Sequence, residues 1–293
     1  MIATIHTDMT IDDYHAFASE RVWSKSNLKE MIPPTGCPAL FRYHYMGAER
    51  PEKKQSAAMT VGKLVHTLAL EPHLFAESVY VLPEGVKCDA RQKEYQSHIA
   101  EAAGREIINA KDMADIEGMA ESLTRNAFAM SLLKAPGNVE ASIFWTDEAT
   151  GHKLRCRPDF LRDDGLIVDL KTTATVRPDM FRKTAFDLAY DVSVALTCRG
   201  YEALTGKRPD NYVFLAVEKS PPYLIECYDT FRSFDMELSY LDGGELRLQQ
   251  ALMLLTDCIA SDRWPGYCGG ITPMEYPVYA KKFIPGGEDA DEQ

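Results

Sequence analysis

The chain lacks the long apolar stretches that would place it in a membrane. No segment of its 293 residues approaches the roughly 18 consecutive apolar residues that a membrane-spanning helix requires. The opening residues, MIATIHTDMTIDDYH, also lack the basic, then apolar, then small-residue order of a signal peptide. The sequence therefore predicts a cytoplasmic protein with no membrane partner.

The chain also lacks three common nucleotide-binding and hydrolase motifs and any closely spaced pair of cysteines. The chain contains no G-x-x-x-x-G-K-S/T, G-x-G-x-x-G or G-x-S-x-G, so ATP-driven, dinucleotide-binding and serine-hydrolase chemistries are not favoured. Its seven cysteines include no C-x-x-C pair and predict free thiols. An iron–sulfur cluster needs a tight group of cysteines, whereas Cys258 and Cys268 stand alone. We therefore expect no iron–sulfur cluster.

Positive charge is scarce, because 32 Lys and Arg face 44 Asp and Glu and give a net charge of −12. A broad basic surface that coats nucleic acid is therefore not expected, since such binding needs many side chains that neutralise phosphates. A local basic channel can still coexist with an acidic exterior. Part of the acidity lies in residues 286–293, expected to be a disordered acidic tail behind one domain of residues 1–285.

Helical periodicity dominates the first half of the chain. Residues 10–32 predict a short helical entry that Thr10 caps. Residues 57–70 carry apolar side chains at helical spacing and predict a helix that packs on a core. Residues 111–134 predict one long helical segment whose inner apolar stripe includes Phe128.

The apolar period then changes to two residues, which is typical of strands. An antiparallel meander is predicted from three strands at 141–145, 152–157 and 166–171. Further elements are predicted as helices at 191–204 and 234–260 and as strands at 212–217 and 223–228. Together they predict an α/β, or α+β, fold with a central mixed β-sheet flanked by helices.

The meander brings charged side chains together on neighbouring strands. Asp169 and Lys171 are two residues apart, so they point to the same face of their strand. Pro158 must interrupt the preceding strand and turn Asp159 toward them. Two converging carboxylates repel each other unless they share a cation, and oxygen ligands suit Mg²⁺ or Mn²⁺. With a lysine beside such an ion, the cluster predicts a phosphodiester hydrolase.

Each candidate residue also has an ordinary structural interpretation. An acid two residues before a lysine should occur on the order of twice by chance in such a chain and usually marks a solvated strand edge. His66 alone is more often a core histidine than a ligand. Glu140 alone would be a surface acid. Arg155 and Arg157 precede Asp159 and could contact a phosphate near the metal, or form a surface ion pair instead.

Several longer blocks follow one another along nearly the whole chain: Trp23-Ser24-Lys25-Ser26, Gly62-Lys63-Leu64-Val65-His66, Leu70-Glu71-Pro72, Glu140-Ala141-Ser142-Ile143-Phe144-Trp145, Arg155-Cys156-Arg157-Pro158-Asp159, Asp169-Leu170-Lys171-Thr172-Thr173, Gly200-Tyr201-Glu202-Ala203 and Asp262-Arg263-Trp264-Pro265. In this order they resemble the C-terminal nuclease domain of the RecE, or exonuclease VIII, group. That group belongs to the RecB-like branch of the PD-(D/E)xK nucleases. The resemblance implies the restriction-endonuclease-like core of that superfamily.

The resemblance implies a phage- or prophage-type recombination nuclease that degrades double-stranded DNA ends 5′ to 3′ and leaves 3′ single strands. In the family, the positions matching His66, Asp159 and Asp169 bind metal, the position of Lys171 is catalytic, and Glu140 is a supporting catalytic carboxylate. Mg²⁺ or Mn²⁺, as two ions, is the expected cofactor. The family assembles as a homo-oligomeric ring, which would enclose the duplex despite the acidic net charge. A RecT-like single-strand annealing protein is the expected partner.

The chain departs from many relatives at one pair of positions. They carry Gln-x-x-x-Tyr on the helix after the lysine strand, where this chain has Ser193 and Thr197. Both lie on one helix face, and we expect them to contact DNA together with Arg155 and Arg157. Their shorter side chains leave open a catalytically weakened protein that binds DNA ends or a partner. An endonuclease or flap-cutting enzyme of the same fold is the other alternative.

Overall fold

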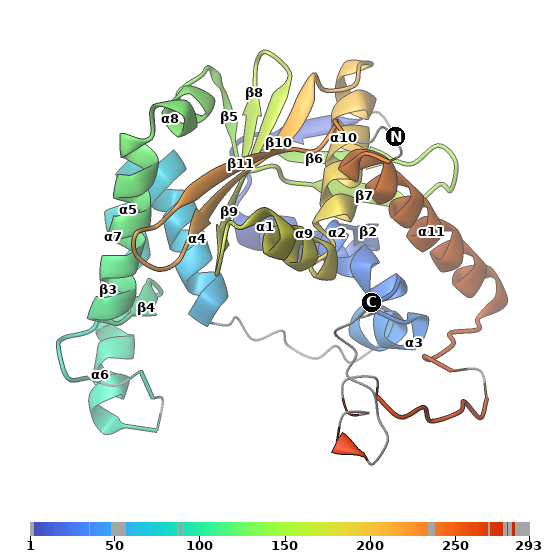
Figure 1. Ribbon diagram of the computed structural model, residues 1–293, viewed down its shortest axis with the longest axis horizontal. Helices are drawn as coiled ribbons and strands as arrows, with labels where there is room; N and C mark the ends of the chain where they lie inside the picture. The colour runs from blue at the N-terminus through green and yellow to red at the C-terminus, as the bar shows by residue number, and fades with distance from the viewer. Residues whose placement is uncertain are drawn as a thin grey trace.

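The structure is a computed structural model that describes residues 3–34, 36–47, 57–86, 88–89, 91–233, 238–268, 270–277, 280 and 283–284. The acidic tail expected at 286–293 lies outside these residues. Within them, the strands form a five-stranded, a four-stranded and a two-stranded sheet. Helices flank the five-stranded sheet (Figure 1), so the predicted class of a mixed sheet flanked by helices is confirmed.

The described helices are α1 (Ile11–Ala16), α2 (Lys25–Leu28), α3 (Pro38–Phe41), α4 (Ala57–Leu70), α5 (Pro72–Ser78), α6 (Lys93–Ala102), α7 (Ala110–Arg125), α8 (Ala127–Leu133), α9 (Pro178–Asp187), α10 (Tyr190–Thr205) and α11 (Tyr240–Ser261). The strands are β1 (Thr4–His6), β2 (Val22–Trp23), β3 (Val79–Val81), β4 (Glu106–Ile108), β5 (Gly137–Val139), β6 (Ser142–Thr146), β7 (Lys153–Cys156), β8 (Phe160–Arg162), β9 (Leu166–Thr173), β10 (Asn211–Glu218) and β11 (Ile225–Asp229). Shorter 3₁₀ or π turns lie at Phe17–Glu20, Lys29–Met31 and Arg42–Met46.

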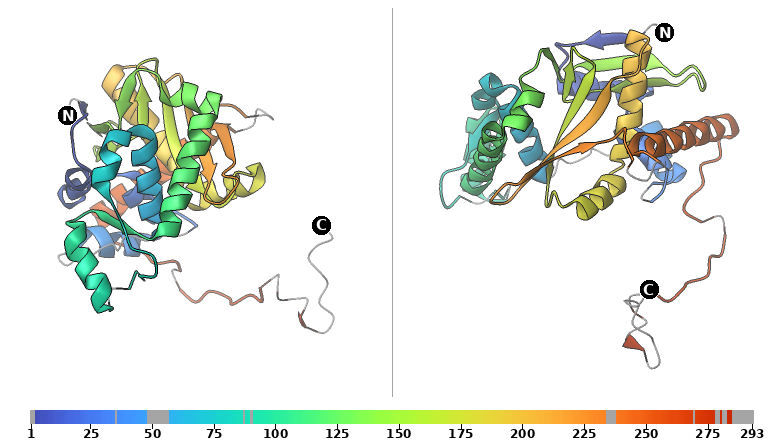
Figure 2. Two further views of the ribbon diagram at one scale, coloured as in Figure 1. Left: turned by 90° about the vertical axis from the view of Figure 1, so that its left-hand side faces the viewer. Right: turned by 45° about the horizontal axis from the view of Figure 1, so that its top comes forward.

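The five-stranded sheet forms the centre of the molecule, in the strand order β11-β10-β9-β8-β5. β9 and β10 run parallel, and the other neighbouring strands of this sheet run antiparallel. The chain passes from β9 to β10 through α9 and α10, because parallel strands need a long crossover. Figures 1 and 2 show α4 and α7 on one side of the sheet and α10 and α11 on the other. The second sheet has the order β1-β6-β7-β2.

Side chains of the central strand β9 alternate between the two helical layers. Val168 and Leu170 pack in the apolar cluster that includes α4 and α7. Ile167 packs in the cluster that includes α10 and α11. Because neighbours along a strand point to opposite faces, Asp169 and Lys171 face the α10 side. This alternation puts two charged side chains of a buried strand on one face.

The predicted antiparallel meander is wrong in one respect. β6 and β7 do pair antiparallel, but they belong to the four-stranded sheet. β9 pairs instead with β8, a short strand that the sequence did not indicate. The chain leaves β7 at Arg157 and Pro158 and enters the other sheet after Asp159. Pro158 has no N–H to donate, so the ladder of β7 cannot continue through it.

The single long helical segment predicted at 111–134 is also wrong, since Asn126 divides it into α7 and α8. Asn126 has an extended backbone with φ −84° and ψ 106°, and its side chain accepts a hydrogen bond from the N–H of Ala129. A short amide side chain that caps a helix in this way competes with the helical backbone pattern. Phe128, expected on the inner stripe, is 61% exposed as a result of the new helix direction.

The start of α1 and the end of α10 agree with their predictions. The hydroxyl of Thr10 accepts a hydrogen bond from the N–H of Asp13 and begins α1. Gly206, with φ +74°, ends α10 in the left-handed region that glycine adopts without strain. Of the helices in the described ranges, none combines the length and the apolar character needed to cross a membrane.

The packing of α10 on α11 gives a test of this fold. A Cβ atom added to Gly244 would lie 2.1 Å from the backbone oxygen of Asp191, so Gly244→Ala must push the two helices apart. We expect a loss of about 1 to 3 kcal/mol in unfolding free energy, seen as a drop of several degrees in thermal unfolding. The matched control is Gly243→Ala, whose Cβ would meet the Leu238 side chain at an ordinary 3.7 Å. The control should be neutral or stabilising by up to about 1 kcal/mol. Equal losses in both variants would contradict the packing.

Candidate active site

Two acidic residues lie where the chain changes from one sheet to the other. β5 leads through Glu140 into β6 of the four-stranded sheet, and β7 leads back through Asp159 into β8. The N–H of Glu140 donates to the carbonyl oxygen of Asp159 at 2.9 Å, which holds the two crossings side by side. Glu140 also has a φ of +50°, a region that is strained for a residue with a side chain. We call residues 140–141 and 157–159 the seam.

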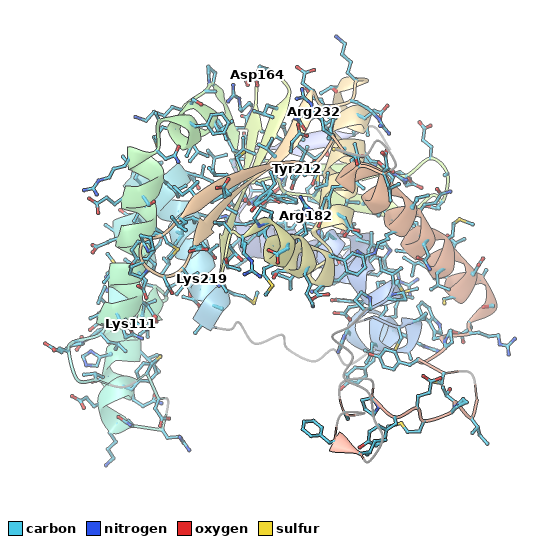
Figure 3. All side chains as sticks on the ribbon, in the orientation of Figure 1. Lys111, Asp164, Arg182, Tyr212, Lys219 and Arg232 are labelled. Atoms are coloured by element: carbon cyan, nitrogen blue, oxygen red, sulfur yellow. The ribbon has the colours of Figure 1, made fainter. Side chains whose placement is uncertain are left out.

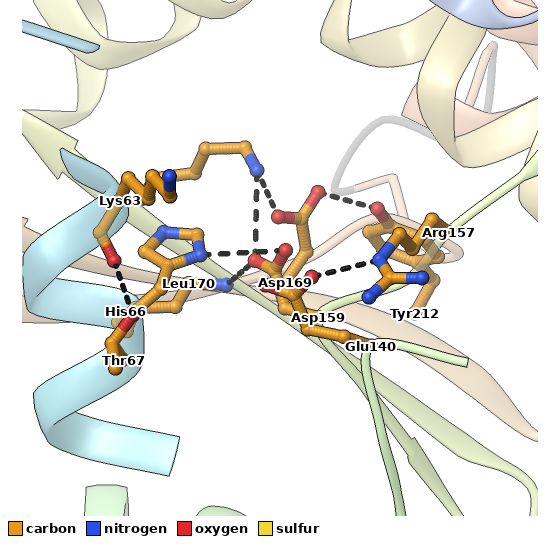
Figure 4. A network of polar contacts seen from close by, with 10 residues as sticks. Lys63, His66, Thr67, Glu140, Arg157, Asp159, Asp169, Leu170 and Tyr212 are labelled. Atoms are coloured by element: carbon orange, nitrogen blue, oxygen red, sulfur yellow. Dashed lines mark hydrogen bonds and ion pairs between the residues drawn. The ribbon is translucent and has the colours of Figure 1, made fainter. Parts of the chain in front are cut away.

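Three side chains suited to binding a metal converge at the seam (Figure 4). Nδ1 of His66, on α4, lies 3.5 Å from Oδ1 of Asp159. One ligand atom each from His66, Glu140 and Asp159 lie within 4.8 Å of one another. The N–H of Leu170, on β9, donates to Oδ2 of Asp159 at 2.8 Å. This hydrogen bond occupies the second oxygen of Asp159 and leaves the first directed at the imidazole.

Asp169 and Lys171 contact each other on β9, as their two-residue spacing predicts. The ammonium of Lys171 donates to Oδ1 of Asp169 and lies 3.9 Å from Oδ2 of Asp159. The hydroxyl of Tyr212, on β10, donates to Oδ2 of Asp169 at 2.5 Å. β8 pairs with β9 so that Phe160 lies opposite Val168, and continuing this register brings Asp159 next to Asp169.

The converging group differs from the predicted ligand set by one member. The sequence predicted His66, Asp159 and Asp169 as metal ligands, whereas the group that the structure brings together contains Glu140 beside His66 and Asp159. Both oxygens of Asp169 accept hydrogen bonds, from Lys171 and from a buried tyrosine. Each carboxylate oxygen has a further lone pair, so Asp169 can still contribute to a cation site.

Glu140, Asp159, Asp169 and Lys171, but not His66, line a cavity of about 270 Å³. Ser193 and Thr197, predicted to contact DNA, lie on the wall that α10 provides. Tyr212 reaches the cavity from β10, and Figure 3 labels it near the middle of the molecule, away from the turn that carries Asp164. Residues of α1 and α2 complete the lining. A ligand in this cavity would meet polar side chains from several elements at once.

The two arginines predicted to contact a phosphate have different surroundings, although both line the cavity. Arg157 is paired, because its Nε donates to Glu140 at 2.8 Å and its Nη1 donates to the hydroxyl of Ser142 at 2.6 Å. Arg155 is only 1% exposed and lies over the ring of Tyr14, 4.7 Å from the centroid. Arg157 therefore fixes the position of Glu140 at the seam, and Arg155 has no comparable role there.

Burial and neighbouring charges set the protonation of the site in the metal-free chain. Burial alone would lower the pKa of His66, but Asp159 raises it above its ordinary value. Burial alone would raise the pKa of Asp159, but the His66 and Lys171 charges hold it well below its usual range. Burial raises the pKa of Asp169 by more than the Lys171 charge lowers it. The two carboxylates raise the pKa of Lys171 against its burial, so Lys171 is a cation at neutral pH.

Three further residues of the site have no separate signal in the sequence. Tyr212 lies in a strand that otherwise reads as apolar, and nothing in the sequence marks its hydroxyl as part of the site. Lys25 lies within one of the matching blocks, and Tyr190 belongs to none of them. The ring centroid of Tyr190 lies 5.1 Å from the ammonium of Lys25 and 5.1 Å from that of Lys171. Such cation–π contacts across the chain are visible only after folding.

Comparison with solved structures relates this fold to known ones. A crystal structure from Eubacterium rectale named "Putative exonuclease" is similar with a TM-score of 0.63 and 15% identity, over 94% of this chain and 98% of that chain. A crystal structure of SSO0001 matches 66% of this chain and 85% of its own at 14% identity, but with a TM-score of 0.29. The Eubacterium rectale structure shares the fold of this chain, and at 15% identity the similarity shows the fold alone. A search of curated proteins gives no match.

The fold and the seam define a PD-(D/E)xK-like domain. The family model described as "PDDEXK-like domain of unknown function (DUF3799)" matches residues 24–276, a range that contains every candidate site residue. The chain belongs to this family. The predicted PD-(D/E)xK core is thereby confirmed, and the match supports a nuclease family. It identifies the superfamily and not the RecE group in particular.

The residues at the seam fit a divalent cation. Domains of the PDDEXK type usually use such ions, and the imidazole and carboxylates here are ligands that Mn²⁺ and Mg²⁺ accept. His66, Glu140 and Asp159 would hold the ion. Asp169 lies close to them, because the Lys171 ammonium contacts both Asp159 and Asp169. A cation would also stabilise the site electrostatically, because it would relieve the repulsion between the carboxylates.

The raised pKa of His66 predicts how metal binding depends on pH. The folded metal-free chain favours the protonated imidazole more than a free histidine does, and an imidazole must be neutral to bind a metal. Mn²⁺ affinity should therefore begin to fall while the pH is still above 6.5, by up to about tenfold per pH unit below the raised pKa. Calorimetric titration of Mn²⁺ between pH 6 and 8 measures this dependence. His66→Ala should bind more weakly and lose this part of the pH dependence. An identical pH profile in the variant would count against ligation by His66.

Proposed function

We propose that the chain is a metal-dependent exodeoxyribonuclease that degrades linear double-stranded DNA 5′ to 3′ and leaves 3′ single strands for annealing. The observation that carries the proposal is the convergence of Asp159, Asp169 and Lys171 with His66 and Glu140 on a PD-(D/E)xK fold. This combination supplies ligands for a cation, a fixed positive charge and a cavity beside both. A phosphodiester at the seam would meet all three.

The proposed cofactor is Mg²⁺ or Mn²⁺, as two ions. When bound, such ions polarise a phosphoryl oxygen and make a water easier to ionise. Lys171 would offset the negative charge that develops on the phosphate, because it is a cation held close to both carboxylates. Tyr212 donates to Asp169 and fixes its orientation. Tyr190 packs beside the Lys171 ammonium and limits the positions that it can take.

Action at DNA ends is supported by the resemblance to the RecE group and by the exonuclease name of the structural neighbour. A homo-oligomeric ring around the duplex would reconcile DNA binding with the net charge of −12, because enclosure replaces a broad basic surface. A RecT-like annealing protein would take over the 3′ single strands. Ser193 and Thr197 would contact the strand from α10 through hydroxyl groups in place of longer side chains.

Linear and covalently closed circular duplexes test the proposal directly. With Mg²⁺ or Mn²⁺, linear DNA should be degraded while circles stay intact, and a label at the 5′ end should be released before a label at the 3′ end. Cleavage of circles would favour an endonuclease or flap-cutting enzyme of the same fold. Binding to DNA ends without any cleavage would favour a non-catalytic end-binding protein.

Substitutions on β9, beside the seam, should separate metal binding from charge stabilisation. Asp169→Asn and Lys171→Ala should each lower cleavage by far more than about tenfold, which corresponds to about 1.4 kcal/mol in the barrier. Lys171→Ala should keep Mn²⁺ binding, because lysine is not a ligand, whereas Asp169→Asn should weaken it, because a neutral amide oxygen binds a cation less strongly than a carboxylate. Lys183→Ala is the control, since this exposed lysine pairs with Asp187 one turn along α9. Activity within about tenfold of wild type in both the Asp169 and the Lys171 variant would refute the assignment.

A further inference from the structure

The N-terminal segment, residues 3–23, reaches the seam although it precedes the range that the family model matches. That range begins at residue 24. β1 pairs with β6 and places His6 opposite Ser142, two residues after the seam begins to cross between the sheets. α1 follows β1 and contributes to the wall of the cavity at the seam. The segment is therefore a structural neighbour of the metal site.

The guanidinium of Arg157 connects this segment to the seam. Its Nε donates to Oε2 of Glu140 at 2.8 Å. Its Nη1 donates to the carbonyl oxygen of Met9 at 3.0 Å and to the hydroxyl of Ser142 at 2.6 Å. One of these acceptors is thus a backbone group of the N-terminal segment, and another is a fully buried side chain. The guanidinium can hold Glu140 in one place because its other end is itself held.

Packing fixes the N-terminal segment against the sheet that leads to the seam. Tyr14 is buried in an apolar cluster with side chains of β2 and β6, and Met9 packs against this cluster. The Tyr14 ring centroid lies 4.7 Å from the guanidinium of Arg155, with which Tyr14 also forms a side-chain hydrogen bond. It lies 6.0 Å from the guanidinium of Arg157. These contacts tie α1 to β7 and give the carbonyl group of Met9 a fixed position.

Glu140 depends on this support more than the other candidate ligands do. Its side chain is 30% exposed, more than those of His66 and Asp159. Within the described ranges, its carboxylate has one hydrogen-bond partner, the Nε of Arg157. The N–H of Glu140 fixes its backbone through Asp159, but this bond leaves the carboxylate free to rotate. Arg157 therefore decides whether the carboxylate points at the other ligands.

We propose that the N-terminal segment positions the metal ligand Glu140 through Arg157, so that residues 9–14 set the affinity of the seam for a divalent cation without touching the ion. The inference rests on the proposed function, because it names what holds one ligand of the proposed metal site. Arg157 is then a positioning residue and not a phosphate contact. Replacing a residue that holds a metal ligand from behind typically costs about 10- to 100-fold in metal affinity.

Charge and position predict opposite effects of removing Arg157. A cation beside a metal ligand repels a second cation, so charge alone predicts that Arg157→Met binds Mn²⁺ more tightly. Loss of position predicts binding that is weaker by about tenfold or more, because the Glu140 carboxylate would lose its partner. Calorimetric titration of Mn²⁺ measures the sign. Arg177→Met removes an arginine from an exposed pair with Asp179 and should bind Mn²⁺ as wild type does. Equal or tighter binding by Arg157→Met would overturn the inference.

Ser142→Ala tests the same support without changing any charge. Ser142 is fully buried, so its hydroxyl cannot contact a bound strand. Its loss frees one end of Arg157 and should weaken Mn²⁺ binding by at least about threefold. The control is Thr256→Ala, which removes a part-buried hydroxyl paired with His152 and should keep the wild-type Mn²⁺ affinity. Wild-type affinity in Ser142→Ala would overturn the inference, also in the case that Arg157→Met fails to fold.

Hydrogen exchange tests the N-terminal segment itself. If the segment sets metal affinity, bound Mn²⁺ must stabilise the segment by the same factor, since coupling between two sites is reciprocal. Exchange of the α1 backbone N–H groups in the wild-type chain should therefore slow by about fivefold or more when Mn²⁺ is added. In Arg157→Met at saturating Mn²⁺, this slowing should disappear from α1 and persist in α4, which carries His66. Unchanged exchange of α1 in the wild-type chain would refute the role of the segment.

DNA binding in EDTA distinguishes positioning from a phosphate contact. Arg157→Met and Arg177→Met each remove one positive charge, so their affinities for a duplex should agree within about twofold. A loss of about tenfold confined to Arg157→Met, with Mn²⁺ affinity unchanged, would mark a phosphate contact and overturn the inference.

The outcomes also separate this inference from the proposed function. A chain that degrades linear DNA, but whose Mn²⁺ affinity does not depend on Arg157 or Ser142, keeps the nuclease function and loses the positioning role. A chain whose Mn²⁺ affinity shows this dependence but that cleaves no DNA keeps the positioning role and loses the nuclease function. A wild-type chain that binds no Mn²⁺ would overturn both.

Discussion

The hydrogen bond from the N–H of Glu140 to the carbonyl oxygen of Asp159 joins the two places where the chain crosses between sheets. The crossing after β5 carries Glu140, and the crossing before β8 carries Asp159. β8 then pairs with β9 in a register that brings Asp169 beside Asp159. α4 packs against the same sheet and adds His66. The site is thus held by backbone pairing on strands, and such positioning is more precise than a loop allows.

The balance of charge inside the site follows from this crowding. The seam brings acidic groups close together, and each cation that lies between them relieves part of their repulsion. Lys171 serves two carboxylates, and Arg157 is held by Glu140. Arg155 remains without such a partner. A chain with a net charge of −12 therefore contains a cavity whose wall also carries positive side chains.

Prediction from the sequence succeeded where a local signal was sufficient. α4 and α10 were expected from helical spacing and from the glycine that ends α10, and both are present. The strand carrying Asp169 and Lys171 was also recognised, because a two-residue period fixes which side chains share a face. Prediction failed at Asn126, which caps a second helix, and in the pairing of β9. Pro158 does interrupt β7 as expected, but the entry of the chain into another sheet after it cannot be read from apolar periodicity.

The sequence by itself determined the kinds of group that the site would contain and the pairing of Asp169 with Lys171 along one strand. It also indicated the superfamily, because ordered blocks matched over nearly the whole chain. Only the tertiary structure decided that Glu140 joins His66 and Asp159, that Tyr212 holds Asp169, and that Arg155 lies buried over the ring of Tyr14. The reason is physical, since these contacts join residues far apart in the chain. Their distances depend on strand pairing and helix packing, and no local spacing encodes them.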